Sequence, residues 1–219
     1  MHPHRLLALL LTFAALSLPV EADSGKWENE IAAFDTADRA QAPEKGGIVF
    51  VGSSSIRLWK TLAQDFPEHR VLNRGFGGSE IADSTFYTNR IIVPYAPRMV
   101  VLYAGGNDLN AGKSPEKVIA DFKAFAAGTR EKLPDAVIAY ISIAGNPARW
   151  GHIEKVKAVN AAIEMWIKEQ PRMKFIDVFP HMMGADGLPK PEIFVEDRLH
   201  MNGAGYAIWK EVVGPFLKE

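Results

Sequence analysis

The sequence contains no cysteine among its 219 residues. Disulfide bonds, thiolate metal sites and cysteine nucleophiles are therefore excluded. The 25 basic and 26 acidic residues leave a net charge of −1, and no basic tract with interleaved aromatic residues occurs. A protein with this charge pattern is not expected to bind nucleic acid.

Two well-known motifs are also missing. The sequence has neither the Gly-x-Ser-x-Gly motif of an α/β-hydrolase nucleophile elbow nor the His-Glu-x-x-His motif of a zinc site. His69, His152 and His181 are scattered along the chain, which favours surface or structural roles for them. We therefore expect no metal and no other cofactor.

The longest apolar run, residues 6–18, lies close to the start of the chain. It follows a short basic stretch, is too short to span a bilayer comfortably, and precedes a small-residue cleavage site after Ala22. Because no cysteine follows the run, a lipoprotein anchor is excluded. We expect residues 1–22 to be a signal peptide and the mature protein to be periplasmic or secreted, without stable membrane insertion. An uncleaved anchor or a buried helix is the alternative.

A buried strand followed by serines organises the rest of the chain. Residues 48–51 are Ile-Val-Phe-Val, which is typical of a strand buried on both faces. Gly52 and the serines at 53–55 follow, and a helical pattern begins at Ile56. Ligands of parallel sheets bind at the carboxyl ends of strands, and a helix N-terminus there stabilises negative charge. A role limited to helix capping is the alternative for these serines.

Strand and helix patterns alternate five times. Strands are expected at residues 48–51, 70–73, 99–103, 136–143 and 173–178. Helices are expected at residues 26–41, 56–66, 80–92, 115–133, 149–169 and 203–217. This alternation predicts an α/β protein whose mostly parallel sheet has helices on both faces. The sequence has no internal repeat or linker, so we expect residues 23–219 to form a single domain.

Polar residues suited to acyl transfer stand at the ends of the expected strands or in loops. Acyl transfer by serine requires a hydroxyl nucleophile, an imidazole base, a carboxylate that orients the base, and donors for the oxyanion. Asp197 and His200 are three residues apart, which can place the carboxylate beside the imidazole. A helix cap beside a surface histidine is the alternative. Asn107 follows two glycines that expose its amide, although this is also ordinary turn chemistry.

These clusters resemble the sequence blocks of the SGNH hydrolases, also called the GDSL esterases and lipases, from about Ile48 to Tyr206. The first block falls on Gly52-Ser53-Ser54-Ser55, which implies that Ser54 is the nucleophile. The block departs from the family pattern, because Ser53 replaces the aspartate and Ser55 the leucine. Neither replaced residue belongs to the catalytic triad.

The other three blocks follow in the family's order. The Asn-x-x-x-x-Gly block falls on Asn73 to Gly78 and implies that Gly78 supplies an oxyanion N–H. The Gly-x-Asn-Asp block matches outright and implies that Asn107 supplies a side-chain donor. The Asp-x-x-His block implies that Asp197 orients His200, the general base.

The resemblance implies a three-layer α/β/α sandwich with a five-stranded parallel sheet in flavodoxin-like order. It implies a serine hydrolase that cleaves carboxylic esters through an acyl-serine intermediate and needs no cofactor. The oxyanion would be held by the N–H groups of Ser54 and Gly78 and by the amide of Asn107. A catalytically inactive glycan-binding module is the alternative from another functional class.

The partner expected from the sequence is a small-molecule or glycan ester. Asn146, Arg149 and Trp150 follow the fourth expected strand and are candidates for a polar, stacking wall of the substrate cleft. An ordinary helix start with a packed tryptophan is the alternative for Arg149 and Trp150. Short connections at this edge favour short acyl chains, since a long chain needs a deep apolar slot. A polysaccharide or xylan O-acetyl esterase, a lysophospholipase and a thioesterase remain open, and the sequence carries no signal for the oligomeric state.

Overall fold

The computed structural model of the protein describes residues 25–218. At its centre is a wholly parallel five-stranded sheet in the order β2-β1-β3-β4-β5. The strands are β1 (Ile48–Gly52), β2 (Val71–Gly75), β3 (Met99–Tyr103), β4 (Val137–Ile141) and β5 (Met173–Ile176). This is the flavodoxin-like order, in which the winding direction switches between β1 and β3.

Side chains on the strands alternate between two apolar cores, as the period of two along a strand requires. In β1, Val49 and Val51 belong to one core, whereas Ile48 and Phe50 belong to the other. The first core is covered by α1 (Glu28–Ala40), α4 (Ile81–Phe86), α5 (Thr88–Ile91), α6 (Gly106–Asn110), α7 (Pro115–Lys132) and α8 (Ile153–Lys168). The second core is covered by α2 (Ser54–Arg57), α3 (Leu62–Asp65) and α9 (Gly203–Val213).

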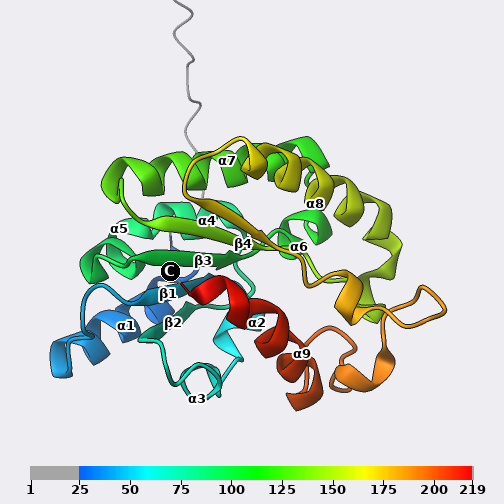
Figure 1. Ribbon diagram of the computed structural model, residues 1–219, viewed down its shortest axis with the longest axis horizontal. Helices are drawn as coiled ribbons and strands as arrows, with labels where there is room; N and C mark the ends of the chain where they lie inside the picture. The colour runs from blue at the N-terminus through cyan, green and yellow to red at the C-terminus, as the bar shows by residue number, and fades with distance from the viewer. Residues whose placement is uncertain (1–24, 219) are drawn as a thin grey trace, which may run out of the picture.

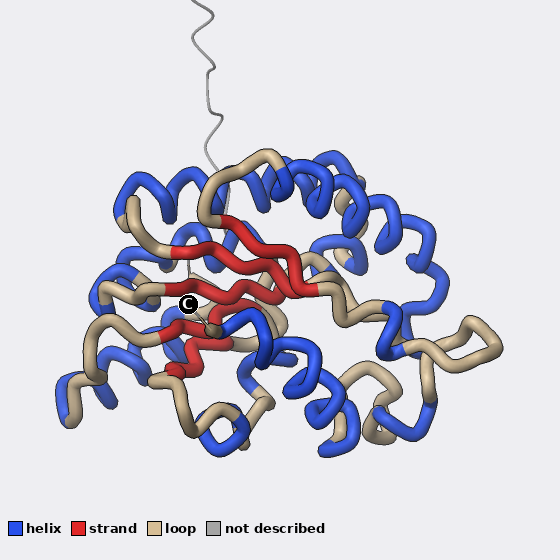
Figure 2. Tube along the Cα trace, viewed as in Figure 1, coloured by secondary structure: helices blue, strands red, loops and turns tan. Residues whose placement is uncertain are grey.

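The arrangement of layers is visible in both overall views. Figure 1 shows α7 and α8 together on one side of the sheet and α9 on the other. Figure 2 shows the strands, in red, enclosed by helices, in blue. The predicted three-layer α/β/α sandwich with a five-stranded parallel sheet is therefore confirmed.

The helix predicted at residues 56–66 is divided into α2 and α3. Between them, the fully buried Trp59 fills the second core, where its ring meets Phe50 and Trp209 edge to face at 5.9 and 5.8 Å. Burial and edge-to-face contacts of so large a ring stabilise the second core. The burial of Trp59 thus accompanies the break, and α2 ends at Arg57.

The segment at residues 180–196 is irregular, as its glycines and prolines predict. It contains only two short 3₁₀ turns, η3 (Pro180–Met182) and η4 (Pro191–Ile193). Within residues 25–218, no helix is both long and apolar enough to cross a membrane. The predicted signal peptide, residues 1–22, lies outside the described residues.

Candidate active site

The turn after β1 requires glycine at position 52. Gly52 has a φ of +128°, and a Cβ atom there would lie 2.0 Å from the carbonyl oxygen of Tyr103. The chain can therefore pass close to β3 only without a side chain at this point. The backbone N–H of Ser53 then donates to the same carbonyl at 3.0 Å, and α2 begins at Ser54. The Ser54 hydroxyl thus lies at a helix N-terminus at the carboxyl end of β1, next to the point where the winding direction switches.

A chain of two hydrogen bonds links Ser54 to His200 and Asp197. The Ser54 Oγ lies 2.8 Å from His200 Nε2, although 146 residues separate them. His200 Nδ1 lies 2.5 Å from Oδ2 of Asp197. The other carboxylate oxygen of Asp197 accepts the backbone N–H groups of Leu199 and His200, each at 2.9 Å. The carboxylate is therefore held facing the imidazole.

The electrostatics of Asp197 suit a residue that stays ionised. Partial desolvation opposes the charge, but the backbone N–H and imidazole of His200 and the N–H of Leu199 outweigh it. Together they lower the pKa of Asp197 to about 2. An ionised Asp197 keeps the proton of a neutral imidazole on Nδ1, which leaves Nε2 free to accept the Ser54 proton.

The start of α9 and α2 are tied together, which fixes His200 against Ser54. The hydroxyl of Tyr206 donates to the backbone carbonyl of Ser55 at 2.8 Å. The Tyr206 ring also stacks on Trp59 at a centroid distance of 5.5 Å. Tyr206 lies in α9, six residues after His200 in the chain. These contacts therefore hold the segment that carries His200 close to the segment that carries Ser54.

Asn107, at the start of α6, has its amide oriented by two hydrogen bonds. Its Nδ2 donates to the carbonyl oxygen of Ser79 at 3.0 Å, and its Oδ1 accepts from Nη1 of Arg149 at 2.9 Å. A Cβ atom on Gly78 would lie 3.6 Å from Nδ2 of Asn107, so the two predicted oxyanion donors are neighbours. The structure thus brings Gly78 and Asn107 together.

Ser54, Asn107 and His200 line one small cavity of about 30 Å³. Asn146 and Arg149 line it as well, whereas Trp150 does not. The Asn146 side chain accepts the backbone N–H of Arg149 at 3.0 Å and so caps η2 (Pro147–His152). Of the three residues predicted to contact substrate, the structure therefore places two at the cavity.

The model of the GDSL-like lipase/acylhydrolase family matches residues 46–208 of the chain. The chain belongs to this family. The resemblance seen between Ile48 and Tyr206 in the sequence is thereby confirmed, and it covers the serine, amide and histidine side chains of the site.

Individual proteins similar to this acylhydrolase agree with that assignment. Subunit alpha1 of platelet-activating factor acetylhydrolase IB from Bos taurus is 28% identical over 199 residues, which cover 83% of this chain and 78% of the relative. A Streptococcus pneumoniae structure named for platelet-activating factor has a TM-score of 0.77 at 19% identity, covering 88% of this chain and 94% of its own. A GDSL-like lipase from Bacteroides thetaiotaomicron has a TM-score of 0.73 at 19% identity, and the match covers 85% of this chain and 96% of the lipase chain. The two structures show the shared fold.

The loop that carries Gly78 is held from outside the segment that the family model matches. Glu30 in α1 accepts the backbone N–H of Gly77 at 2.8 Å. The Trp27 ring packs so closely that a Cβ atom on Gly77 would lie 1.7 Å from it. Trp27 Nε1 also donates to Asp83 at 2.9 Å. Sequence reasoning missed Trp27 and Glu30, because α1 appeared there only as an amphipathic helix.

Asp108 forms a buried ionic cluster behind the candidate site. Its carboxylate is fully buried, accepts the Ile81 N–H at 3.3 Å and lies 3.0 Å from Nζ of Lys113. Burial raises the pKa of Asp108 to about 6, although Lys113 opposes the shift. Asp108 therefore ties α4 to α6 and points away from the cavity, and it is not among the residues that line it.

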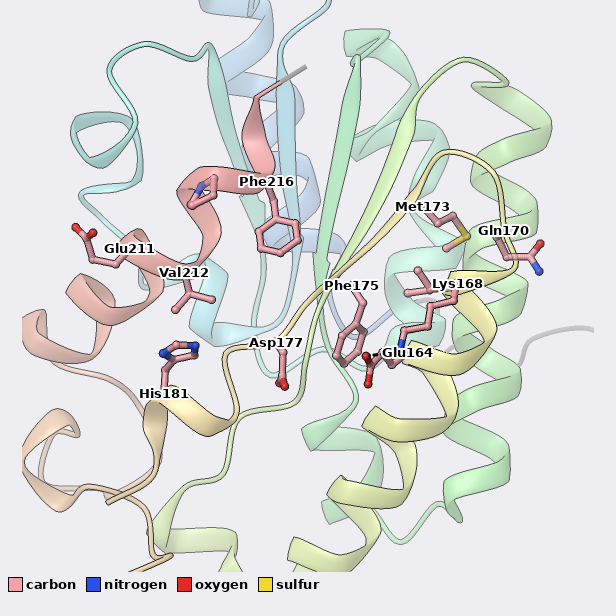
Figure 3. A pocket seen from close by; sticks show the side chains of 12 residues that line it. Glu164, Lys168, Gln170, Met173, Phe175, Asp177, His181, Glu211, Val212 and Phe216 are labelled. Atoms are coloured by element: carbon pink, nitrogen blue, oxygen red, sulfur yellow. Dashed lines mark ion pairs between the residues drawn. The ribbon is translucent and has the colours of Figure 1, made fainter. Parts of the chain in front are cut away.

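A much larger cavity lies elsewhere in the described chain. It has a volume of about 650 Å³ and runs along β5 between α8 and α9. Figure 3 shows its lining, with Phe175 of β5 between Glu164 of α8 and Val212 of α9. Ser54, Asn107 and His200 take no part in it. Within residues 25–218, no group of three or more histidine, aspartate or glutamate side chains is arranged to hold a metal ion.

Proposed function

We propose that this acylhydrolase cleaves carboxylic esters through an acyl-serine intermediate, with Ser54 as the nucleophile. The observation that supports this most strongly is the continuous hydrogen-bonded chain from Ser54 through His200 to Asp197 at the edge of a small cavity. The same three roles define serine acyl transfer on several unrelated folds. If Ser54 served only to cap a helix, its hydroxyl would not need to be hydrogen-bonded to a histidine that is itself bonded to an ionised carboxylate.

In the proposed mechanism, the Ser54 hydroxyl attacks the ester carbonyl while His200 Nε2 takes its proton. The oxyanion that forms is held by the N–H groups of Ser54 and Gly78 and by the amide of Asn107. His200 then returns the proton to the departing alcohol, and a water molecule attacks the acyl-serine by the same route. Asp197 orients the imidazole and stabilises its protonated form. Each oxyanion donor contributes roughly 3–4 kcal/mol to transition-state stabilisation.

The proposed substrate has a short acyl group. The cavity beside Ser54 is small, about 30 Å³, whereas a long acyl chain needs a deep apolar slot to remove it from water. An acetyl group fits this space, and the acetylhydrolase relatives are named for removal of that group. Removal of acetyl groups from a polysaccharide such as xylan uses the same acyl site and is the second candidate. A lysophospholipase or a thioesterase for long acyl chains has no support from this cavity.

Covalent labelling tests the proposed function. A fluorophosphonate probe reacts with an activated serine, so the wild-type protein is expected to become labelled and peptide mass spectrometry to locate the label on Ser54. The Ser54→Ala variant should stay unlabelled, whereas the Ser55→Ala variant should still react. If the folded wild-type protein takes up no label and hydrolyses no acetyl ester, the alternative of a non-catalytic glycan-binding module replaces the proposal.

We also propose that residues 1–22 direct export and are removed, which gives a periplasmic or secreted enzyme. The support is the sequence pattern alone. Expression of the full chain in a bacterium, followed by fractionation and intact-mass measurement, should find a protein that begins after Ala22 outside the cytoplasm. A protein of full mass in the cytoplasm would contradict this.

A further inference from the structure

Arg149 contacts the candidate oxyanion donor Asn107 from a distant part of the chain. Its Nη1 donates to Oδ1 of Asn107 at 2.9 Å, although 42 residues separate the two. Arg149 comes from η2 and Asn107 from α6, and the two elements meet beside Gly106. A Cβ atom on Gly106 would still lie 3.8 Å from Nη1 of Arg149. The guanidinium therefore reaches the amide without a side chain in its way.

This contact and a second one, to Ser79, fix the orientation of the Asn107 amide. Oδ1 of Asn107 accepts a hydrogen bond from Arg149, and the carbonyl of Ser79 accepts one of the two Nδ2 hydrogens. A carboxamide NH₂ group has two hydrogens, so one remains for an oxyanion. With the amide turned over, Nδ2 would face the guanidinium donors of Arg149, and Oδ1 would face the carbonyl of Ser79. Both pairings are repulsive, so Arg149 and the Ser79 carbonyl together select the catalytically useful orientation.

Arg149 is itself held in place and carries no competing ion pair. Its backbone N–H donates to Oδ1 of Asn146, the cap of η2. Within residues 25–218, no carboxylate forms a salt bridge with its guanidinium, and its side chain contacts Asn107 instead. The residue is half-buried, and burial lowers its pKa. A positive charge that is partly removed from water acts more strongly on nearby dipoles than an exposed one.

We propose that Arg149 is a positioning residue for the oxyanion hole, which acts through Asn107 by orienting its amide and polarising it toward the oxyanion. A cation on the carbonyl end of an amide makes its N–H a stronger donor, because linked hydrogen bonds polarise one another. This role differs from the direct substrate contact that the sequence suggests for Arg149. It rests on the proposed function, since the oxyanion arises only if Ser54 attacks an ester.

A double-mutant cycle tests the proposal. Steady-state kinetics with p-nitrophenyl acetate are measured for the wild type, Arg149→Met, Asn107→Ala and the double variant. Methionine keeps much of the apolar stem of Arg149 but has no donor. In the presence of Asn107, we expect Arg149→Met to lower kcat about 10- to 30-fold, less than the 10²- to 10³-fold loss of a whole oxyanion donor, with KM unchanged. In the Asn107→Ala background, the same substitution should leave kcat within about twofold.

Two further variants serve as controls. Arg57 in α2 is exposed and only three residues from Ser54, so Arg57→Met removes an equal charge near the site without touching Asn107. We expect its kcat to match the wild type. Arg149→Lys retains a charged donor and should recover part of the lost kcat. Melting temperatures of all variants are compared, so that a loss of stability is not mistaken for a loss of positioning.

The outcomes separate this inference from the proposed function. If Arg149→Met lowers kcat by the same factor with and without Asn107, or raises KM alone, Arg149 contacts substrate directly and the inference is wrong. If Arg149→Met has full activity while Ser54→Ala has none, the inference is also wrong but the proposed function holds. If the wild type neither hydrolyses the ester nor takes up the fluorophosphonate, both are overturned.

Discussion

Glu30 accepts a hydrogen bond of 2.8 Å from the backbone N–H of Gly77, although α1 precedes the segment that the family model matches. The bond fixes the loop next to Gly78, whose N–H is the proposed second oxyanion donor. An N-terminal helix thus supports the site without contributing a side chain to its cavity. This arrangement makes α1 part of the functional unit of the enzyme.

The first prediction concerns that helix. Glu30→Ala should lower kcat about three- to tenfold with little change in KM, because a carboxylate that accepts a backbone N–H contributes roughly 1.5–3 kcal/mol and the loop would move without it. Glu30→Gln keeps an acceptor oxygen and should retain most of the activity. Steady-state kinetics and melting temperatures of both variants provide the check. A lower melting temperature with unchanged kcat would show that Glu30 supports the fold alone.

The second prediction concerns the nucleophile among three adjacent serines. Ser54→Ala should lower kcat about 10⁴- to 10⁶-fold without loss of the fold, because no other group supplies the attacking oxygen. Ser55→Ala should have nearly normal activity. Ester hydrolysis and far-UV circular dichroism of each purified variant are sufficient to compare them. If Ser53→Ala or Ser55→Ala abolished activity while Ser54→Ala retained it, the nucleophile would be assigned to the wrong serine.

The third prediction concerns the acyl group. Values of kcat/KM for p-nitrophenyl esters should be highest with two to four acyl carbons and fall for longer chains, because the cavity beside Ser54 holds only about 30 Å³. In a long apolar slot, each added CH₂ would instead contribute about 0.8 kcal/mol, which corresponds to roughly a fourfold rise. A steady increase from the two-carbon to the ten-carbon ester would contradict the short-acyl proposal.

The fourth prediction concerns the buried Asp108. Its pKa is raised from 3.8 to about 6 by burial. Between these values, the native protein holds a proton that the unfolded chain has released. The contribution of Asp108 to the free energy of unfolding therefore falls as the pH rises from about 4 to 7, by on the order of 3 kcal/mol.

A comparison with Asp108→Asn isolates this effect, because the variant has no titrating group at that position. Urea unfolding of both proteins at pH 4 and pH 7 should show the variant less stable relative to the wild type at pH 4 than at pH 7. A difference in stability that does not change with pH would mean that Asp108 stays ionised in the native protein because its ion pair with Lys113 prevails.

The sequence by itself determined the class of fold. Runs such as Ile-Val-Phe-Val at residues 48–51 are buried on both faces, and their alternation with helical patterns is typical of a parallel sheet covered by helices on both sides. The order of the polar blocks at Ser54, Asn107 and His200 also identified the family, because each block ends a strand or precedes a helix. Such local patterns report which residues are buried and where the chain turns.

Only the tertiary structure decided how the site is supported. Glu30 and Gly77, which are in contact, are separated by 47 positions in the sequence. Arg149 and Asn107 are separated by 42 positions. Neither contact leaves a period or a spacing in the sequence. The helix break at Trp59 also depends on tertiary structure. The helical periodicity of the sequence continues through Trp59, but its ring packs against Phe50 and Trp209 in the second core. Hydrophobic periodicity indicates which residues of a single helix or strand are buried. A hydrogen bond between two elements depends instead on how those elements pack, and the order of the strands in the sheet establishes that packing.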